Sequence, residues 1–532
     1  MRRRSRGKPT RAPSAVNSIW IDTVKTMTGI RLTTLLALSA SALTLAACGA
    51  AEVASPGEGD FGGTGGGGTT TPPTLPPGTP AADCPTGFAN VGTVAGGTLR
   101  ACQLPQQING NLTVPLRAGT IYSINGRTSV GTDMGVDPAA PIAGSVQGIL
   151  TIEPGVRLFA SGGSDYLLVN RGSQLFAEGT ATAPIVFTSR QNVEGSTTQD
   201  SQGQWGGIVL AGRAPQANCQ LTAPVTCTGT VEGTSAFFGG NTPADNSGRL
   251  RYVQIKFSGF EISTGNELQG LTMAGVGSGT TVEFIQVHNS SDDGIEWFGG
   301  RVNHKRIVIT GADDDSIDTD LGFKGLIQYA LVVQRSNGGD RVIEADTAGG
   351  ETKTPRSNPR IANFTFIGNR TPDSVLLRGG TDYGLTNGII RNTTATGLCL
   401  DIDGAQTAVT TADAPTDEAG APIFRSVIFG CSGAARDESD VPLASITPII
   451  TGNNNLLPPQ TLTLTDIFLP GSFETGAVAT NPRTAFPGTG TFFDETTFVG
   501  AFRNAADTWY AGWTCGVGTG ATACTAAPSP IQ

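Results

Sequence analysis

From about residue 84 onward, short apolar runs alternate with turns rich in Gly, Asn, Asp and Ser. The apolar positions lack the 3.6-residue spacing of a helix, and runs of this kind predict strands. One polar and apolar order recurs along the chain, first at an interval of 22 residues: Asp-Gly-Ile-Glu at 293–296, Asp-Ser-Ile-Asp at 315–318, Asp-Ser-Val-Leu at 373–376 and, more loosely, Asp-Arg-Val-Ile at 340–343. Gly-Val-Arg-Leu-Phe-Ala at 155–160 also resembles Gly-Ser-Gln-Leu-Phe-Ala at 172–177.

A repeat of this length has a simple physical solution. Each coil lays its strands on those of the coil below, about 4.8 Å away, and like residues stack inside. The expected interior stack is Ile295, Ile317, an aliphatic residue near Val342, Val375 and Leu398. A sandwich or barrel would show hairpin turns of the Asn-Gly type, and few are present.

We therefore predict an all-β fold, a right-handed parallel β-helix similar to the pectin-lyase-like solenoids, with disulfide-stapled end caps. The N-terminal cap is expected at 84–140, the β-helix at 141–440, and C-terminal rungs and a cap at 441–532.

The densest candidate chemistry lies on two successive coils. Because alternate positions of a strand point to opposite faces, some of these carboxylates must crowd together on the outer surface. Like charges one coil apart repel unless something neutralises them. Calcium takes six to eight oxygen ligands in irregular geometry. We therefore predict a calcium site among eight residues: Asp292, Asp293, Glu296, Asp313, Asp314, Asp315, Asp318 and Asp320.

Two other interpretations of these acidic residues remain open. Asp in turns between strands often accepts hydrogen bonds from local backbone N–H groups. Two carboxylate clusters one coil apart also suit acid/base work on a glycoside. The arrangement is similar to that of the polygalacturonases, but no His follows His304, so their Gly-His-Gly motif is absent.

Composition narrows the class of partner. The chain has 44 acidic and 34 basic residues, for a net charge of −10, and eight of the basic residues but one acidic residue lie in 1–48. The rest is therefore strongly acidic, which argues against a nucleic-acid partner. With 74 Gly and 15% charged residues, the chain does not resemble a helical bundle. Two His leave little material for zinc or Ser-His-Asp chemistry.

The N-terminus predicts export and a lipid anchor. An apolar run at 32–47 follows Arg31 and suits the apolar region of a signal peptide. It ends in Leu-Ala-Ala-Cys at 45–48, which resembles the lipobox of bacterial lipoproteins, where the Cys becomes the lipid-modified (palmitate-bearing) first residue of the mature protein. We predict a leader and lipoprotein signal peptide at 1–47, and the anchor Cys48 with a Gly/Thr/Pro-rich linker at 48–83. By the family rule Gly49, where an Asp would direct inner-membrane retention, favours the outer membrane or cell surface.

The other eight cysteines predict disulfides, because an even set in an exported chain is typical of them. Proximity in the sequence gives four expected pairs: Cys84 with Cys102, Cys219 with Cys227, Cys399 with Cys431, and Cys515 with Cys524.

Several motifs together resemble a family of secreted or lipid-anchored parallel β-helix proteins of Gram-negative bacteria. They include Gly-Gln-Trp-Gly-Gly-Ile at 203–208, Ser-Asp-Asp-Gly-Ile-Glu-Trp-Phe-Gly-Gly at 291–300 and Val-Gly-Ala-Phe at 499–502. Members are often labelled multidrug transporters, and some relatives form surface layers.

The resemblance implies a lipid-anchored protein of the outer membrane or cell surface with a structural or adhesive role rather than an enzymatic one. Calcium-dependent surface-layer assembly, self-association or contact with an envelope glycan would follow. The alternative is a polysaccharide-processing lyase or glycoside hydrolase, or a carbohydrate-binding β-helix protein.

Overall fold

The computed structural model describes residues 75–217, 219–221, 225–348 and 352–528. The predicted signal peptide, Cys48 and most of the linker lie outside these residues. Within them, no helix has the length and apolar character needed to span a bilayer.

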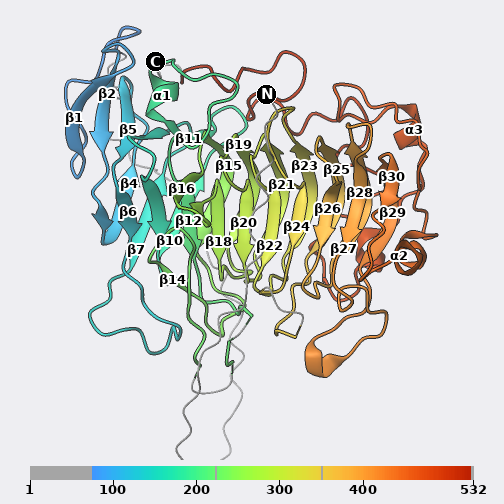
Figure 1. Ribbon diagram of the computed structural model, residues 1–532. Coiled ribbons are helices and arrows are strands. Elements are labelled where there is room, and N and C mark those ends of the chain that lie inside the picture. The colour runs from blue at the N-terminus through green and yellow to red at the C-terminus, as the bar shows by residue number, and fades with distance from the viewer. Residues whose placement is uncertain (1–74, 218, 222–224, 349–351, 529–532) are drawn as a thin grey trace, which may run out of the picture. The chain divides into compact units, whose positions relative to one another are not determined.

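Two large sheets make up the body, and their strands follow one another along the stack from β1 and β2 to β29 and β30 (Figure 1). Sheet A has 15 strands: β1 (Ala89–Val94), β2 (Leu99–Gln103), β4 (Gly110–Val114), β5 (Thr120–Ile124), β7 (Gly148–Ile152), β8 (Arg157–Ala160), β10 (Gln174–Glu178), β11 (Ile185–Ser189), β15 (Gly248–Lys256), β19 (Thr281–His288), β21 (Asn303–Thr310), β23 (Leu326–Val333), β25 (Arg360–Gly368), β27 (Gly384–Asn392) and β29 (Ile423–Gly430). Sheet B has 11: β3 (Gln107–Ile108), β6 (Arg127–Val130), β9 (Tyr166–Val169), β12 (Ile208–Ala211), β18 (Leu271–Ala274), β20 (Ile295–Phe298), β22 (Ile317–Asp320), β24 (Ile343–Ala345), β26 (Asp373–Leu377), β28 (Leu398–Ile402) and β30 (Gly433–Ala435).

The remaining elements lie in the connections. Two short hairpins pair β13 (Gly229–Thr230) with β14 (Phe237–Phe238) and β16 (Phe260–Ser263) with β17 (Asn266–Leu268). The helices are short: α1 (Arg190–Val193), the 3-10 helix η1 (Ala414–Thr416), α2 (Leu443–Ile450), α3 (Ser472–Thr475) and α4 (Pro482–Ala485).

The long strands of sheet A bend at one position each. β15 pairs with β10 through its first half and with β11 through its second half. Between the halves Tyr252 has φ +50°, and Phe284 and Arg306 occupy the same place in the next two strands with φ +55° and +59°. Each coil therefore has three straight sides, two in sheet A and one in sheet B, and the all-β parallel β-helix prediction is confirmed.

The interior stack differs from the prediction at one position. The register places Ile295, Ile317, Ile343, Val375 and Leu400 opposite one another. Leu398 was predicted for the last place, but it lies opposite Asp373, two residues earlier in the strand. The aliphatic residue near Val342 is Ile343, so the loose repeat at 340–343 is one residue out of phase. A loop inserted before it shifts the spacing without disturbing the stack.

The 17-residue similarity between 155–160 and 172–177 does not mark a coil. β8 pairs with β5 and β11, whereas β10 pairs with β7 and β15. The two segments occupy different sides of the β-helix. They resemble each other because both sides need the same turn followed by inward apolar residues.

The predicted N-terminal cap consists largely of the first strands of both sheets, β1 to β6. The stack ends at β1, which pairs antiparallel with β2. At the other end of the stack, helix α2 follows the last strands, and its Ile446 and Ile450 are buried in the main core. Among the described residues no strand begins after Ala435, so the C-terminal rungs expected in 441–532 do not form as strands.

Instead, residues 461–528, the C-terminal strap, run back along the outer surface of sheet A and end beside α1 (Figure 1). Trp513 lies edge-on to Tyr252 and Phe284, with ring centroids 5.8 Å apart in both pairs. Gln254 and Gln286 donate side-chain hydrogen bonds to the strap carbonyls of Trp513 and Cys515. The outward positions of these long strands are apolar or amide side chains, which need a cover that no further coil supplies.

The four predicted disulfides are all present: Cys84–Cys102, Cys219–Cys227, Cys399–Cys431 and Cys515–Cys524. The first ties the beginning of the stack and the third ties its last coils. The other two lie in the connection after β12 and in the C-terminal strap.

Candidate functional site

Sheet B presents a row of carboxylates on its outer surface. The register places Glu296 opposite Asp318, and Asp318 opposite Glu344. Ile295 and Trp297, on either side of Glu296, are buried in the core. Because successive side chains of a strand point to opposite faces, this row faces outward. Carboxylates of like charge therefore stand one strand spacing apart, about 4.8 Å.

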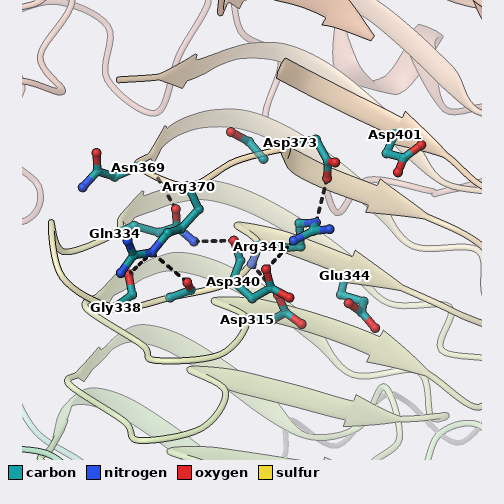
Figure 2. A network of polar contacts seen from close by, with 12 residues as sticks. Asp315, Gln334, Gly338, Asp340, Arg341, Glu344, Asn369, Arg370, Asp373 and Asp401 are labelled. Atoms are coloured by element: carbon teal, nitrogen blue, oxygen red, sulfur yellow. Dashed lines mark hydrogen bonds and ion pairs between the residues drawn. The ribbon is translucent and has the colours of Figure 1, made fainter. Parts of the chain in front are cut away.

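A second column of polar side chains lies in the turns that precede these strands. Asp293 Oδ1 accepts a hydrogen bond from the Asp315 N–H at 2.9 Å, and Asp315 Oδ1 accepts one from the Arg341 N–H at 2.6 Å. The Arg341 guanidinium then pairs with Asp373, with Nε 2.6 Å from Oδ1 (Figure 2). The turn-capping interpretation thus holds for one oxygen of Asp293 and one of Asp315.

Four of these carboxylates are poorly compensated. Only 6% of Asp293, 5% of Glu296 and 5% of Asp315 is exposed. Burial, followed by repulsion from neighbouring carboxylates, raises the pKa of Asp293, Glu296, Asp315 and Asp318 well above the usual carboxyl range. In the described part of the chain no Lys or Arg forms an ion pair with any of the four, although their neighbours do. Glu296 Oε2 is buried and has no hydrogen-bond partner.

The carboxylates meet in overlapping groups of three. Within each group one oxygen of every residue lies within 4.8 Å of the others: Asp292, Asp293 and Asp314; Asp293, Glu296 and Asp318; Asp314, Asp315 and Asp340. Calcium binds oxygens at 2.3–2.6 Å, so two oxygens on one ion are at most about 5 Å apart. The spacing therefore fits a calcium ion bound by side chains of successive coils.

Two of the eight predicted ligands are engaged elsewhere. Asp313 forms an ion pair with Arg335 and accepts a hydrogen bond from Gln202 Nε2 at 2.6 Å. Asp320 Oδ1 accepts backbone hydrogen bonds from Leu321 and Ala348 at 2.5 and 2.7 Å. Neither belongs to a group of three. The structure thus brings together Asp292, Asp293, Glu296, Asp314, Asp315 and Asp318 and assigns capping and pairing roles to the other two.

On the later coils, arginine side chains balance carboxylates on the same outer face of sheet B. Arg378 pairs with Glu344 and Asp346, and Arg436 pairs with Asp401 and Glu438. Sequence reasoning missed these residues. A one-residue correction of the 340–343 repeat would have aligned Glu344 with Asp318. On these later coils arginines therefore offset part of the negative charge, although Asp403, Glu438 and Asp440 form a further group of three.

The acidic groups are bounded on one side by the connection between β12 and β15. Val231, Ala236 and Phe238 from this connection pack on Tyr166 and Val209, which project outward from sheet B. This packing brings Glu232 near Glu296, where its charge raises the pKa of Glu296 further. This connection therefore forms a wall beside the acidic groups. The wall explains why Glu296 is more than nine-tenths buried although its side chain points outward from sheet B.

A family of known proteins shares this architecture. Residues 115–427, more than half of the chain, match the family described as the pectate-lyase-like β-helix domain. The chain belongs to this family. Comparison with the curated proteins gave no match, and neither did comparison with the solved structures. In this pectate-lyase-like β-helix, the acidic groups lie on the outward side of sheet B rather than in the interior of the stack.

Stability should depend on pH in opposite ways with and without calcium. The four carboxyl groups have folded-state pKa values above their unfolded values of about 4. Their stabilising contribution is therefore complete below pH 4 and is lost as the pH rises through the folded pKa values. In a chelator we expect the melting temperature to fall as the pH rises from about 4. Excess calcium should remove or reverse that slope, because it binds the deprotonated form. Parallel slopes in both buffers would contradict a cation site at these carboxylates.

Proposed function

We propose that this pectate-lyase-like β-helix protein is an exported cell-surface component with a structural or adhesive role, and that calcium bound at Asp293, Glu296 and Asp318 supports that role. One observation carries the proposal. Glu296 holds a carboxylate oxygen that is buried, unpartnered and surrounded by other carboxylates. A buried charge of this kind costs several kcal/mol unless it is protonated or paired with a cation.

The proposed calcium would be held mainly by side chains from successive coils. It would replace the repulsion between Asp293 and Asp318 with a shared attraction, and so would fix the spacing of the coils. The remaining coordination positions could be filled by water or by oxygen atoms of a second molecule. An ion with open positions on an outer face is a means of joining two copies or a copy and a glycan.

The N-terminal sequence supports the proposed location. The Leu-Ala-Ala-Cys motif at 45–48 would supply the lipid, and the Gly- and Pro-rich residues after it would act as a tether. This assignment can be tested separately from calcium binding. Labelled palmitate should be incorporated into the wild-type protein, and Cys48→Ser should abolish incorporation and release the protein from the membrane fraction. Equal labelling of both proteins would refute the anchor.

The function is tested by imaging purified protein and intact cells, with calcium and with a chelator. We expect ordered or clustered assemblies in calcium that disperse on chelation. The Glu296→Gln variant should give dispersed protein in both conditions. A monodisperse wild-type protein in both conditions would contradict calcium-dependent assembly.

A second candidate, polysaccharide processing, is favoured by the raised carboxyl pKa values, since a general acid must hold its proton at neutral pH. Asp293 and Asp315, which lie one coil apart where the Asp315 backbone N–H donates to Asp293 Oδ1, are the candidates for acid and base. If they catalyse glycoside cleavage, Asp293→Asn or Asp315→Asn should abolish sugar release from a responsive polysaccharide and leave the melting temperature within a few degrees. A broad polysaccharide panel that yields no product would reject this candidate.

A further inference from the structure

A cavity of about 580 Å³ lies between sheet A and the C-terminal strap. Its sheet-side wall contains His288, Val333 and Arg335, at and just beyond the ends of β19 and β23. Its strap-side wall contains Phe468 and Val517. Cavities of this size with a few polar groups are typical of sites for small molecules. It does not include the acidic residues of sheet B.

Two cationic side chains flank this cavity, one of them half-buried and the other buried. Arg335, whose side chain is 15% exposed, pairs with Asp313 through Nη2, but its Nε and Nη1 are buried and have no hydrogen-bond partner. Lys256 is 4% exposed, and its Nζ donates to the carbonyl of Cys524, a cavity residue, at 3.0 Å. Lys256 has no ion pair within the described ranges. The two partnerless Arg335 nitrogens and the unpaired charge of Lys256 favour an anion at this place, although the chain has a net charge of −10.

His288 is a further polar residue of the cavity wall, and the charges of Lys256 and Arg335 act on it. Its Nδ1 lies 2.8 Å from Thr310 Oγ1. Burial, reinforced by the charges of Lys256 and Arg335, lowers the pKa of His288 to about 3. The imidazole is therefore neutral at physiological pH and can exchange a hydrogen bond with a ligand without adding charge. The positive charge beside the cavity comes from Arg335, which lines it, and from Lys256, which contacts the lining residue Cys524.

The rim of the cavity combines an acidic and an apolar side chain, Asp466 and Ile467, in an unusual backbone conformation. Asp466 and Ile467 have φ values of +46° and +64°, and a β-branched residue rarely adopts this region. Ile467 nevertheless holds its side chain 51% exposed. Hydrogen bonds between Thr465 and Leu469 close the turn, and Thr519 Oγ1 donates to Asp466 Oδ1 at 2.9 Å. The turn thus places an apolar side chain at the entrance.

We propose that this cavity binds a small organic carboxylate, with its anionic group at Arg335 and its carbon skeleton against Val333, Phe468 and Val517. A charge-assisted hydrogen bond to a guanidinium is among the stronger polar contacts in proteins. The apolar side chains of the wall, with Ile467 at the rim, suit the body of such a molecule. This site is independent of the calcium site, because no residue is shared between them.

Titration calorimetry with matched probes tests the proposal. Benzoate is compared with benzyl alcohol, and galacturonate with galactose, in calcium-free buffer. We expect at least one carboxylate to bind at least 10-fold more tightly than its neutral twin. Arg335→Gln should weaken that binding about 10-fold or more. Arg249→Gln, which makes the same charge change at an exposed ion pair outside the cavity, should leave it unchanged.

A blocking variant protects the test against misfolding of Arg335→Gln. Ala523 lines the cavity from an exposed position, so Ala523→Phe should fill the entrance without disturbing the core. It should also abolish carboxylate binding. The proposal is overturned if no carboxylate binds the wild-type protein, if the neutral twins bind equally well, or if Ala523→Phe binds as tightly as the wild type.

Discussion

Glu296→Gln should weaken calcium binding by about 100-fold, equivalent to about 2.7 kcal/mol. The substitution keeps the size of the side chain but removes a carboxylate whose buried Oε2 lacks a hydrogen-bond partner. Calorimetry on the purified protein gives the affinity. Glu283→Gln is the matched control, because Glu283 lies in the preceding strand β19 and pairs with Arg251 on sheet A. It should bind calcium as the wild type does.

The same variant should change stability in opposite directions with and without calcium. In a chelator Glu296→Gln should melt at a higher temperature than the wild type, because it removes a buried charge next to Asp293 and Asp318. In excess calcium the wild type should melt higher, because ligand binding to the folded state stabilises it. If Glu296→Gln is less stable than the wild type in both buffers, Glu296 acts as an ordinary structural acid.

Trp513→Ala should destabilise the protein by about 3–5 kcal/mol. Trp513 is fully buried against Tyr252 and Phe284, and its Nε1 donates to the carbonyl of Trp509 at 2.8 Å. Its removal opens a void between sheet A and the C-terminal strap. Urea unfolding gives the change in free energy, and limited proteolysis shows whether the strap has detached.

Trp513→Phe is the graded control for the strap. It retains a ring against the two aromatic residues of sheet A and should lose less than half as much stability as Trp513→Ala. If Trp513→Ala costs less than about 1 kcal/mol, the strap contributes little to stability and the outer surface of sheet A does not depend on it.

The β-helix itself could be predicted from the sequence because stacking forces like residues into register. Ile295 and Ile317 repeat at a fixed interval, and their alignment in the structure is the expected one. Prediction failed where insertions change the spacing. The loop before Ile343 displaces the apparent repeat by one residue, and the sequence pattern alone does not distinguish Leu398 from Leu400 because both are aliphatic.

The C-terminal strap could not be predicted by the same reasoning. The strap residues Phe468, Phe486 and Trp513 pack separately on the outer surface of sheet A. Their spacing in the sequence therefore shows no repeat. Their partners, such as Ala362 and Val308, lie far away in the sequence. Nothing in the local pattern separates such a segment from a further coil.

The acidic groups were only partly predictable. Equal spacing placed Asp293 beside Asp315 and Glu296 beside Asp318, because the turns of adjacent coils coincide. The sequence did not reveal that Arg335 would pair with Asp313, since that contact depends on a loop after β23. It also gave no sign of the wall that buries Glu296.

The most direct test of the central claim is a crystal structure of the protein grown in calcium, with anomalous diffraction data collected to locate the ion. The account predicts an anomalous peak at 2.3–2.6 Å from carboxylate oxygens of Asp293, Glu296 and Asp318, and a weaker peak in crystals of Glu296→Gln grown at the same calcium concentration. A wild-type structure in which these carboxylates bond only to one another or to water, with no peak between them, would contradict it.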